Sequence, residues 1–209
     1  MDRPAPARLD AVYGAASAEA QEGAYDAWAS DYDADLMAMG YRLPMMMAAC
    51  VARFVPVDAA PILDAGCGTG LHAEALVAAG YGGLVGADLS EGMMAVARAK
   101  GVYAETHRVV LGTPLPFADG HFAATLCAGT ITPGHAPPEA LDELVRVTRP
   151  GGWLVVSLRH DAEQEARYLD KLDAMAGTAW DEVHRTPAFA TMPLGEPSVR
   201  NRVHVCRVR

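Results

Sequence analysis

The chain has 209 residues, of which 51% are hydrophobic and 21% are charged, a composition typical of a globular protein rather than a disordered one. Its 26 acidic residues exceed its 17 Lys and Arg residues, and the resulting formal net charge of -9 disfavours nucleic acid as a partner. No apolar run approaches the roughly 18 to 20 residues that a membrane-spanning helix needs, so we expect neither a nucleic-acid nor a membrane partner.

The cysteines and the start of the chain give two further expectations. The cysteines are widely spaced and form no CxxC pair: Cys50, Cys67, Cys127 and Cys206. This spacing disfavours a disulfide framework and a zinc site, so no metal is predicted. Because the first residues contain no apolar core of signal-peptide length, we expect a cytoplasmic protein.

The N-terminal quarter of the chain predicts an arm followed by helices. Residues 1–23 are rich in Ala, Pro and Gly and predict a flexible arm, with one short helix around residues 9–20. Residues 24–56 are predicted to form a helical lid, and Pro44 suits the first turn of its second helix. Aromatic and apolar residues recur at helical spacing in the first part of this lid: Trp28, Tyr32, Leu36 and Met39.

Short apolar runs then alternate with amphipathic segments over residues 57–160, which we interpret as a cofactor-binding core. Five strands are predicted at or within "PILDAG", "GLVGAD", "VYAETHRVVLG", "HFAATLCAG" and "WLVVSLR". Helices are predicted between them in "GLHAEALVAAG", "SEGMMAVARAKG" and "PPEALDELVRVTRPGG". Such alternation predicts an α/β fold with a doubly wound, mostly parallel sheet and helices on both faces.

Residues 161–209 change character and predict a helix and two antiparallel strands. The helix is expected in "AEQEARYLDKLDAMAG", and the strands in "WDEVHRTPAFATMP" and "SVRNRVHVCRVR". The segment "LGEPS" would join the strands into a hairpin at the edge of the sheet. Residues 24–209 are thus predicted to form a single domain.

A glycine-rich turn follows the first predicted strand. Gly66, Gly68 and Gly70 let the backbone approach a ligand, and the helix that follows presents N–H groups and a positive end. A turn that serves packing alone is the alternative. Leu71 stands where a dinucleotide fingerprint has its third glycine. Asp64, two residues before the turn, would repel a pyrophosphate and suits a cationic ligand group.

A second acidic residue completes this pattern. Asp88 ends the second predicted strand, where it can accept hydrogen bonds from ribose hydroxyls. A nucleoside with a cationic tail and no pyrophosphate is the description of S-adenosylmethionine.

The motifs "ILDAGCGTG", "GADLSEGMM", "LPFADGHF" and "RVTRPGGWLVVSLR" resemble those of class I S-adenosylmethionine-dependent methyltransferases, over residues 25–160. "YDAWASDYDADL" and "GTITPGHAPPEALDELVRVTRPGG" are similar to the Williams–Beuren-region methyltransferase-like proteins and their bacterial relatives. The resemblance implies a seven-stranded Rossmann-like sheet with a C-terminal antiparallel hairpin, and S-adenosylmethionine as cofactor.

The resemblance also implies roles for residues of the glycine turn. Asp64, Gly66 and Gly70 would line the methionine moiety of the cofactor. Cys67 and Gly68 would pack beneath that moiety through their backbone.

Further roles are implied at the ends of the second and fourth strands. Asp88 would hold the ribose, and Leu89 and Met93 would bracket the adenine. Ala128 and Gly129 would border the reactive methyl group.

In two parts of the implied site, the residues allow another interpretation or depart from the family pattern. Tyr25, Trp28 and Tyr32 would belong to a helix that folds over the cofactor, although the same spacing suits the buried stripe of an amphipathic helix. Both interpretations stay open for Trp28, and the lid is favoured for Tyr32. Relatives often bond the adenine amino group with an acid at the end of the third strand. None stands here, so backbone groups near Val110 to Gly112, including those of Leu111, are expected to replace it.

The expected activity is methyl transfer to a small-molecule acceptor by in-line displacement, in a cleft at the carboxyl ends of the strands, by a monomer or homodimer. His135, in the loop after the fourth strand, is the candidate base or substrate-binding residue, and capping of the next helix is its alternative role. His72, His107 and His121 are interpreted as structural. Two alternatives remain: another use of the cofactor, such as decarboxylation or cyclisation, and a non-catalytic S-adenosylmethionine-binding regulatory or partner subunit.

Overall fold

A computed structural model of the protein describes residues 5–132, 135–160 and 162–209. Its helices are α1 (Ala5–Tyr13), α2 (Ala18–Trp28), α3 (Tyr32–Ala38), α4 (Leu43–Phe54), α5 (Leu71–Ala78), α6 (Glu91–Lys100), α7 (Ala140–Val147) and α8 (Ala162–Met175). Its strands are β1 (Ile62–Ala65), β2 (Leu84–Asp88), β3 (Glu105–Arg108), β4 (Phe122–Cys127), β5 (Thr148–Arg159), β6 (Trp180–Arg185), β7 (Phe189–Met192) and β8 (Glu196–Val208).

The strands form one sheet in the order β3-β2-β1-β4-β5-β8-β6, and the short β7 pairs with β8 beside this path. Strands β1 to β5 are parallel to their neighbours, whereas β8 is antiparallel to β5, β6 and β7. The predicted fold class is confirmed: the sheet is mostly parallel and ends in antiparallel strands. The seven-stranded path matches the expectation, and β7 is an additional strand.

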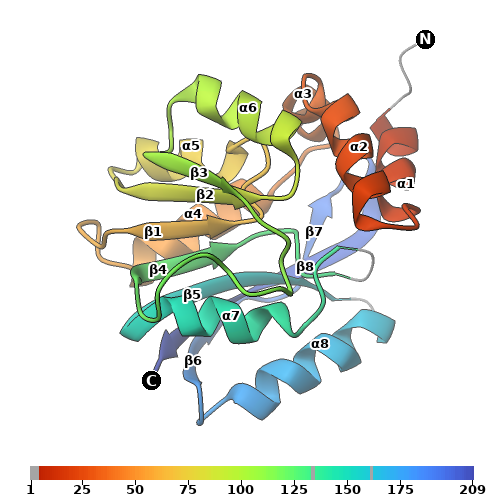
Figure 1. The fold of residues 1–209 in the computed structure, drawn as a ribbon. Coiled ribbons are helices and arrows are strands. Elements are labelled where there is room, and N and C mark those ends of the chain that lie inside the picture. The colour runs from red at the N-terminus through yellow and green to blue at the C-terminus, as the bar shows by residue number, and fades with distance from the viewer. Residues whose placement is uncertain (1–4, 133–134, 161) are drawn as a thin grey trace.

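Helices cover both faces of the sheet (Figure 1). On one face, α7 contributes Leu141 and Leu144 and α8 contributes Leu172 to a buried apolar cluster. On the other face, Val51 of α4 and Leu76 of α5 belong to a second cluster. Strands β1 and β4 are buried at every residue, as expected for central strands of a parallel sheet that is covered on both sides.

The N-terminal segment differs from the predicted flexible arm, whose residues 1–4 lie outside the described residues. Residues 5–23 form α1 and the first half of α2, separated by a turn in which the Ser17 side chain accepts a hydrogen bond from the Ala20 N–H (3.2 Å). Leu9 and Val12 of α1 are buried against Trp28 in a third apolar cluster. These residues are therefore packed, because α1 supplies the apolar side chains that cover the inner face of α2. The extent of the single domain stays a prediction.

The first part of the lid is two helices rather than one. Helix α2 ends at Trp28 and α3 begins at Tyr32, so the helical spacing of these two aromatics does not place them on one face of one helix. Figure 1 shows α1, α2 and α3 grouped together beyond one end of the sheet. We call these three helices the roof.

The predicted C-terminal antiparallel hairpin is confirmed, but one of its strands is interrupted. The segment predicted as one strand is divided into β6 and β7 around Pro187, which has no N–H to donate to a ladder. Both parts pair with β8 in the antiparallel direction, and the order β5-β8-β6 places the hairpin at the edge of the sheet. Within the described residues, no helix is long and apolar enough to span a lipid bilayer.

Candidate functional site

The glycine turn after β1 forms the floor of a pocket. Gly66, Gly68 and Gly70 all have positive φ angles, of 80°, 51° and 79°. A Cβ atom on Gly66 would lie 2.1 Å from Oγ1 of Thr130, whereas a Cβ on Gly68 would meet no atom within 4 Å. The absence of a side chain is therefore required for packing at Gly66, and at Gly68 it leaves open space beside the backbone.

Asp88, at the end of β2, fixes the turn and faces the pocket. Its Oδ2 accepts a hydrogen bond from the Gly68 N–H (2.8 Å), and its Oδ1 accepts one from the Ser90 N–H (2.9 Å). Burial raises the pKa of Asp88 and these backbone donors lower it. Each carboxylate oxygen has more than one lone pair, so the side chain can still accept hydrogen bonds from a diol.

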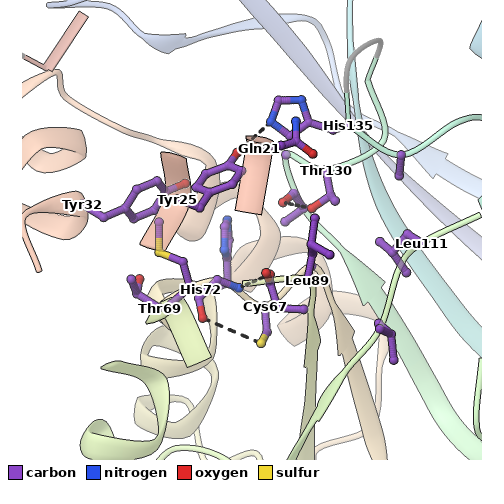
Figure 2. Close-up of a pocket in the computed structure, with 18 of the residues that line it drawn as sticks. Gln21, Tyr25, Tyr32, Cys67, Thr69, His72, Leu89, Leu111, Thr130 and His135 are labelled. Atoms are coloured by element: carbon purple, nitrogen blue, oxygen red, sulfur yellow. Dashed lines mark hydrogen bonds between the residues drawn. The ribbon is translucent and has the colours of Figure 1, made fainter. Parts of the chain in front are cut away.

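The pocket lies between the carboxyl ends of the strands and the roof, and about 930 Å³ of space free of protein atoms, open solvent included, lies within it. The predicted site residues that line it are Tyr25, Tyr32, Gly66, Cys67, Gly68, Asp88, Leu89, Met93, Leu111, Ala128, Gly129 and His135. Figure 2 shows Tyr25 and Tyr32 on one side of it and Leu89 and Leu111 on another.

Four predicted site residues lie outside the lining of this pocket: Trp28, Asp64, Gly70 and Gly112. Trp28 is 2% exposed and its Nε1 donates to Oδ2 of Asp35 (2.7 Å), because the end of α2 turns it into the core of the roof. Gly70 is the N-cap residue of α5 and faces Val102, and Gly112 faces Pro137.

Asp64 lies beneath the glycine turn and is 1% exposed. Its Oδ2 accepts a hydrogen bond from the Tyr103 hydroxyl (2.6 Å), and its buried Oδ1 has no hydrogen-bond partner. Burial raises the pKa of Asp64 to about 6; the Tyr103 hydrogen bond lowers it, and the nearby Asp88 carboxylate raises it. A cationic ligand above the turn would stabilise the ionised form of this carboxyl group.

Several pocket residues were not predicted: Ala18, Gln21, Tyr41, Thr69, Leu71, His72, Val109, Thr130 and Ala136. Thr69 and Leu71 belong to the glycine turn, so its motif could have indicated them. Gln21 and Tyr41 carry no such signal, because they reach the pocket through the packing of the roof.

His72, interpreted from the sequence as structural, forms part of the pocket wall. It lies in the first turn of α5, and its ring is edge-on to the ring of Tyr41 at 5.9 Å. Burial lowers its pKa to about 4, and its Nε2 is buried without a hydrogen-bond partner. A neutral imidazole therefore faces the cavity at neutral pH, and it does not repel a cation.

His135 lines the pocket and contacts two tyrosines of the roof. Its Nε2 lies 2.7 Å from the Tyr25 hydroxyl (Figure 2), and its ring is 5.1 Å from the ring of Tyr13. Burial raises the pKa of Tyr25 well above its ordinary value. The phenol therefore stays protonated and can donate its hydrogen to a neutral imidazole nitrogen.

Residues 63–156 match a family described as a methyltransferase domain. The chain is 37% identical over 171 residues to methyltransferase-like protein 27 from Homo sapiens, a match that covers 80% of this chain and 69% of that protein. It is 40% identical over 105 residues to the demethylmenaquinone methyltransferase of Clavibacter sepedonicus, covering 48% of this chain and 42% of that enzyme.

Solved structures show the same fold. The chain superimposes on a methyltransferase dependent on S-adenosylmethionine from Thermotoga maritima with a TM-score of 0.67 and 18% sequence identity. The superposition covers 88% of this chain and 98% of the Thermotoga chain. At this identity the match concerns the fold alone.

Proposed function

Because the chain belongs to the class I S-adenosylmethionine-dependent methyltransferases, we propose that it transfers the methyl group of S-adenosylmethionine to a small molecule. The observation that carries this proposal is the confined pocket between the glycine turn and three tyrosines, Tyr25 and Tyr32 of the roof and Tyr41 just after it. A cavity roofed in this way suits a small acceptor better than a polymer. The quinone methyltransferase among its relatives acts on a small molecule by its name, which supports the same acceptor class.

The pocket residues fit this cofactor. The lone pairs of Asp88 suit the ribose hydroxyls, and Leu89 and Met93 provide apolar walls for adenine. The open space beside Gly68 suits close approach of the methionine moiety. His72 is neutral and Asp64 is a buried carboxyl group, so both tolerate a positive charge nearby.

S-adenosylmethionine supplies an electrophilic methyl group, and we assign the remaining work to positioning and proton transfer. Ala128 and Gly129 directly follow β4 at the pocket wall, where we place the acceptor atom. Tyr25 and His135 are proposed to carry away the proton of an acidic acceptor. The acceptor would donate to the Tyr25 oxygen while Tyr25 donates to Nε2 of His135, so that the phenol stays neutral throughout.

Labelled S-adenosylmethionine offered with phenols, carboxylates, thiols and amines tests the proposal. We expect transfer to at least one of these classes. Asp88→Ala tests the cofactor site. Loss of a charge-assisted contact of about 1.5–3 kcal/mol should weaken cofactor binding roughly tenfold to a hundredfold in calorimetry. Cofactor binding without transfer to any class would favour the non-catalytic alternative, and labelling of macromolecules alone would contradict a small acceptor.

The role of His135 has its own test. His135→Ala is expected to slow turnover while leaving cofactor affinity unchanged, because the histidine contacts Tyr25 rather than the glycine turn. Turnover is compared at pH 7 and pH 9. Full activity of the variant at neutral pH would return His135 to a structural role.

We also propose that the protein is located in the cytoplasm. Its four free, buried cysteines support this proposal. A monomer or homodimer stays a proposal as well.

A further inference from the structure

A second, smaller pocket adjoins the cofactor pocket beneath the roof. It has about 500 Å³ of space free of protein atoms. It shares Tyr25, Tyr32, Tyr41 and Gly129 with the cofactor pocket. Because Gly129 lies just after β4 at the proposed methyl position, a molecule in this second pocket would have one end against the reacting group. We call this space the acceptor chamber.

One end of the acceptor chamber is polar. Arg159 is the last residue of β5, and in the antiparallel ladder it lies directly opposite Asn201 of β8. Thr191 lies on β7, the next strand beyond β8. All three residues line the chamber, and a directly opposed pair such as Arg159 and Asn201 has Cβ atoms about 4.5–5.5 Å apart. The three side chains therefore gather at the carboxyl end of β5, where this fold places its ligands.

Two of these side chains have unmet hydrogen-bonding capacity. Thr191 is 2% exposed and Asn201 is 4% exposed, yet neither Oγ1 of Thr191 nor Oδ1 of Asn201 has a partner. A buried polar atom without a partner costs free energy. A bound ligand with matching polar atoms would remove that cost, so these atoms indicate a recognition site.

This end carries one cationic side chain. Among the described residues that line the acceptor chamber, Arg159 alone is charged. Its guanidinium lies over the ring of Tyr13, 5.7 Å from the centroid. The guanidinium therefore lies beside an aromatic wall of the chamber. The other walls are aromatic or aliphatic, and include Trp28, Leu36 and Met192.

We propose that the acceptor is a small planar molecule with a carboxylate at the end remote from the methylated atom, and that Arg159, Thr191 and Asn201 bind this carboxylate. The flat apolar body lies between the roof tyrosines. The carboxylate accepts hydrogen bonds from the Arg159 guanidinium and the Thr191 hydroxyl. The Asn201 amide can present its oxygen to a ligand donor or, after rotation, its N–H to the carboxylate. This inference rests on the proposed function.

Binding can be measured apart from turnover. The protein loaded with S-adenosylhomocysteine is titrated with 4-hydroxybenzoate and with its neutral match, 4-hydroxybenzamide, in a calorimeter. We expect the acid to bind at least about tenfold more tightly than the amide, since the acid alone can form the charge-assisted contact. Equal binding of the two probes, or no binding of the acid, would overturn the inference.

Variants locate the effect. Arg159→Gln should abolish the preference for the acid and leave S-adenosylhomocysteine affinity unchanged. Arg149→Gln is the matched control: it makes the same charge change at the opposite, exposed end of β5 and should keep the preference. A preference retained in Arg159→Gln would overturn the inference.

Thr191→Val keeps the inference testable if Arg159→Gln does not fold. It removes a buried hydroxyl that has no partner, so the variant should be at least as stable as the wild type while binding the acid about threefold to tenfold more weakly. Unchanged affinity for the acid would remove Thr191 from the site. The proposed function fails separately, through absence of labelled methyl transfer to any small acceptor, whereas transfer to neutral acceptors without a preference for acids refutes this inference alone.

Discussion

The floor and the roof of the cofactor pocket are held in different ways. The floor, residues 66–70 with the strands around them, is fixed by close packing and by the backbone. The N–H groups of Gly66 and Cys67 both donate to the Ala87 carbonyl, at 2.7 and 3.1 Å. The roof, α1 to α3, shares a small apolar cluster with Met192 of β7, Leu71 of α5 and Val199 of β8, and acidic side chains also connect it to the rest of the protein.

Three acidic residues of the roof make these contacts. Asp26 accepts from the Ser90 hydroxyl (2.6 Å) and the Gly92 N–H (2.8 Å) at the start of α6. Asp33 accepts from the Thr69 hydroxyl and from Lys100, both at 2.5 Å. Glu22 forms a two-pronged ion pair with Arg108, and the Arg108 side chain is about half exposed to solvent.

The floor and the roof therefore differ in how strongly a single substitution should affect them. Contacts of the roof type contribute about 0–1 kcal/mol each when exposed, whereas the geometry of the floor admits almost no change of residue. We therefore expect a single substitution in the floor to have a larger effect than the loss of one polar contact of the roof.

The largest expected effect comes from breaking the floor. Gly66→Ala would place a methyl group against Oγ1 of Thr130 at a φ of 80°. We expect cofactor affinity to fall by more than about a hundredfold and the free energy of unfolding to fall by about 3 kcal/mol, measured by calorimetry and denaturant titration. Gly101→Ala is the matched control: it has a similar φ of 67° and no atom within 4 Å of the added Cβ. Near wild-type binding by Gly66→Ala would contradict a rigid floor.

A smaller effect is expected from pH, through Asp64. Its pKa of about 6, raised by burial from an ordinary 3.8, should fall when the cationic cofactor binds. Cofactor affinity should therefore increase as pH rises from 5 to 7.5, by up to about tenfold. The neutral S-adenosylhomocysteine should depend less on pH, and Asp64→Asn should remove most of the difference. Equal pH profiles for the two ligands would contradict an electrostatic role for the floor.

The same pKa shift affects stability with a defined sign. A carboxyl group whose pKa is higher in the folded protein stabilises the fold while it is protonated. Its contribution is fully present below the unfolded pKa of 3.8 and is lost as pH rises through about 6. Asp64→Asn should flatten the decrease in stability across this interval.

The smallest effects concern the roof. Asp26→Ala removes one anchor of α2 and a cap of α6, and should lower the free energy of unfolding by about 1 kcal/mol and speed amide hydrogen exchange in α2. Gly23→Ala, at an exposed position of α2 with open space around it, should shift stability the other way by about 0.5–1 kcal/mol. We expect Gly23→Ala to slow amide hydrogen exchange in α2 and, because a more stable roof opens less often, to delay cofactor entry. Hydrogen exchange in Asp26→Ala equal to that of the wild type would contradict a roof held by polar anchors.

The sequence by itself determined the floor. Five residues of the pocket lie at a strand end or in the turn or helix that follows it: Gly66, Gly68, Asp88, Leu89 and Met93. The parallel order of those strands follows from the alternation of strands and helices. Local chain geometry is enough to bring such residues to one edge of the sheet, which is why their motif predicted the pocket.

The roof and the acceptor chamber were decided only by tertiary structure. The break between α2 and α3 turned Trp28 away from the cofactor pocket, and helical periodicity cannot reveal a break of three residues. Thr191 and Asn201 lie on the consecutive strands β7 and β8, whereas Arg159 ends the distant strand β5, and the three meet because β8 is inserted beside β5. Pairing between distant strands depends on the packing of the whole sheet, so no local pattern of residues specifies it.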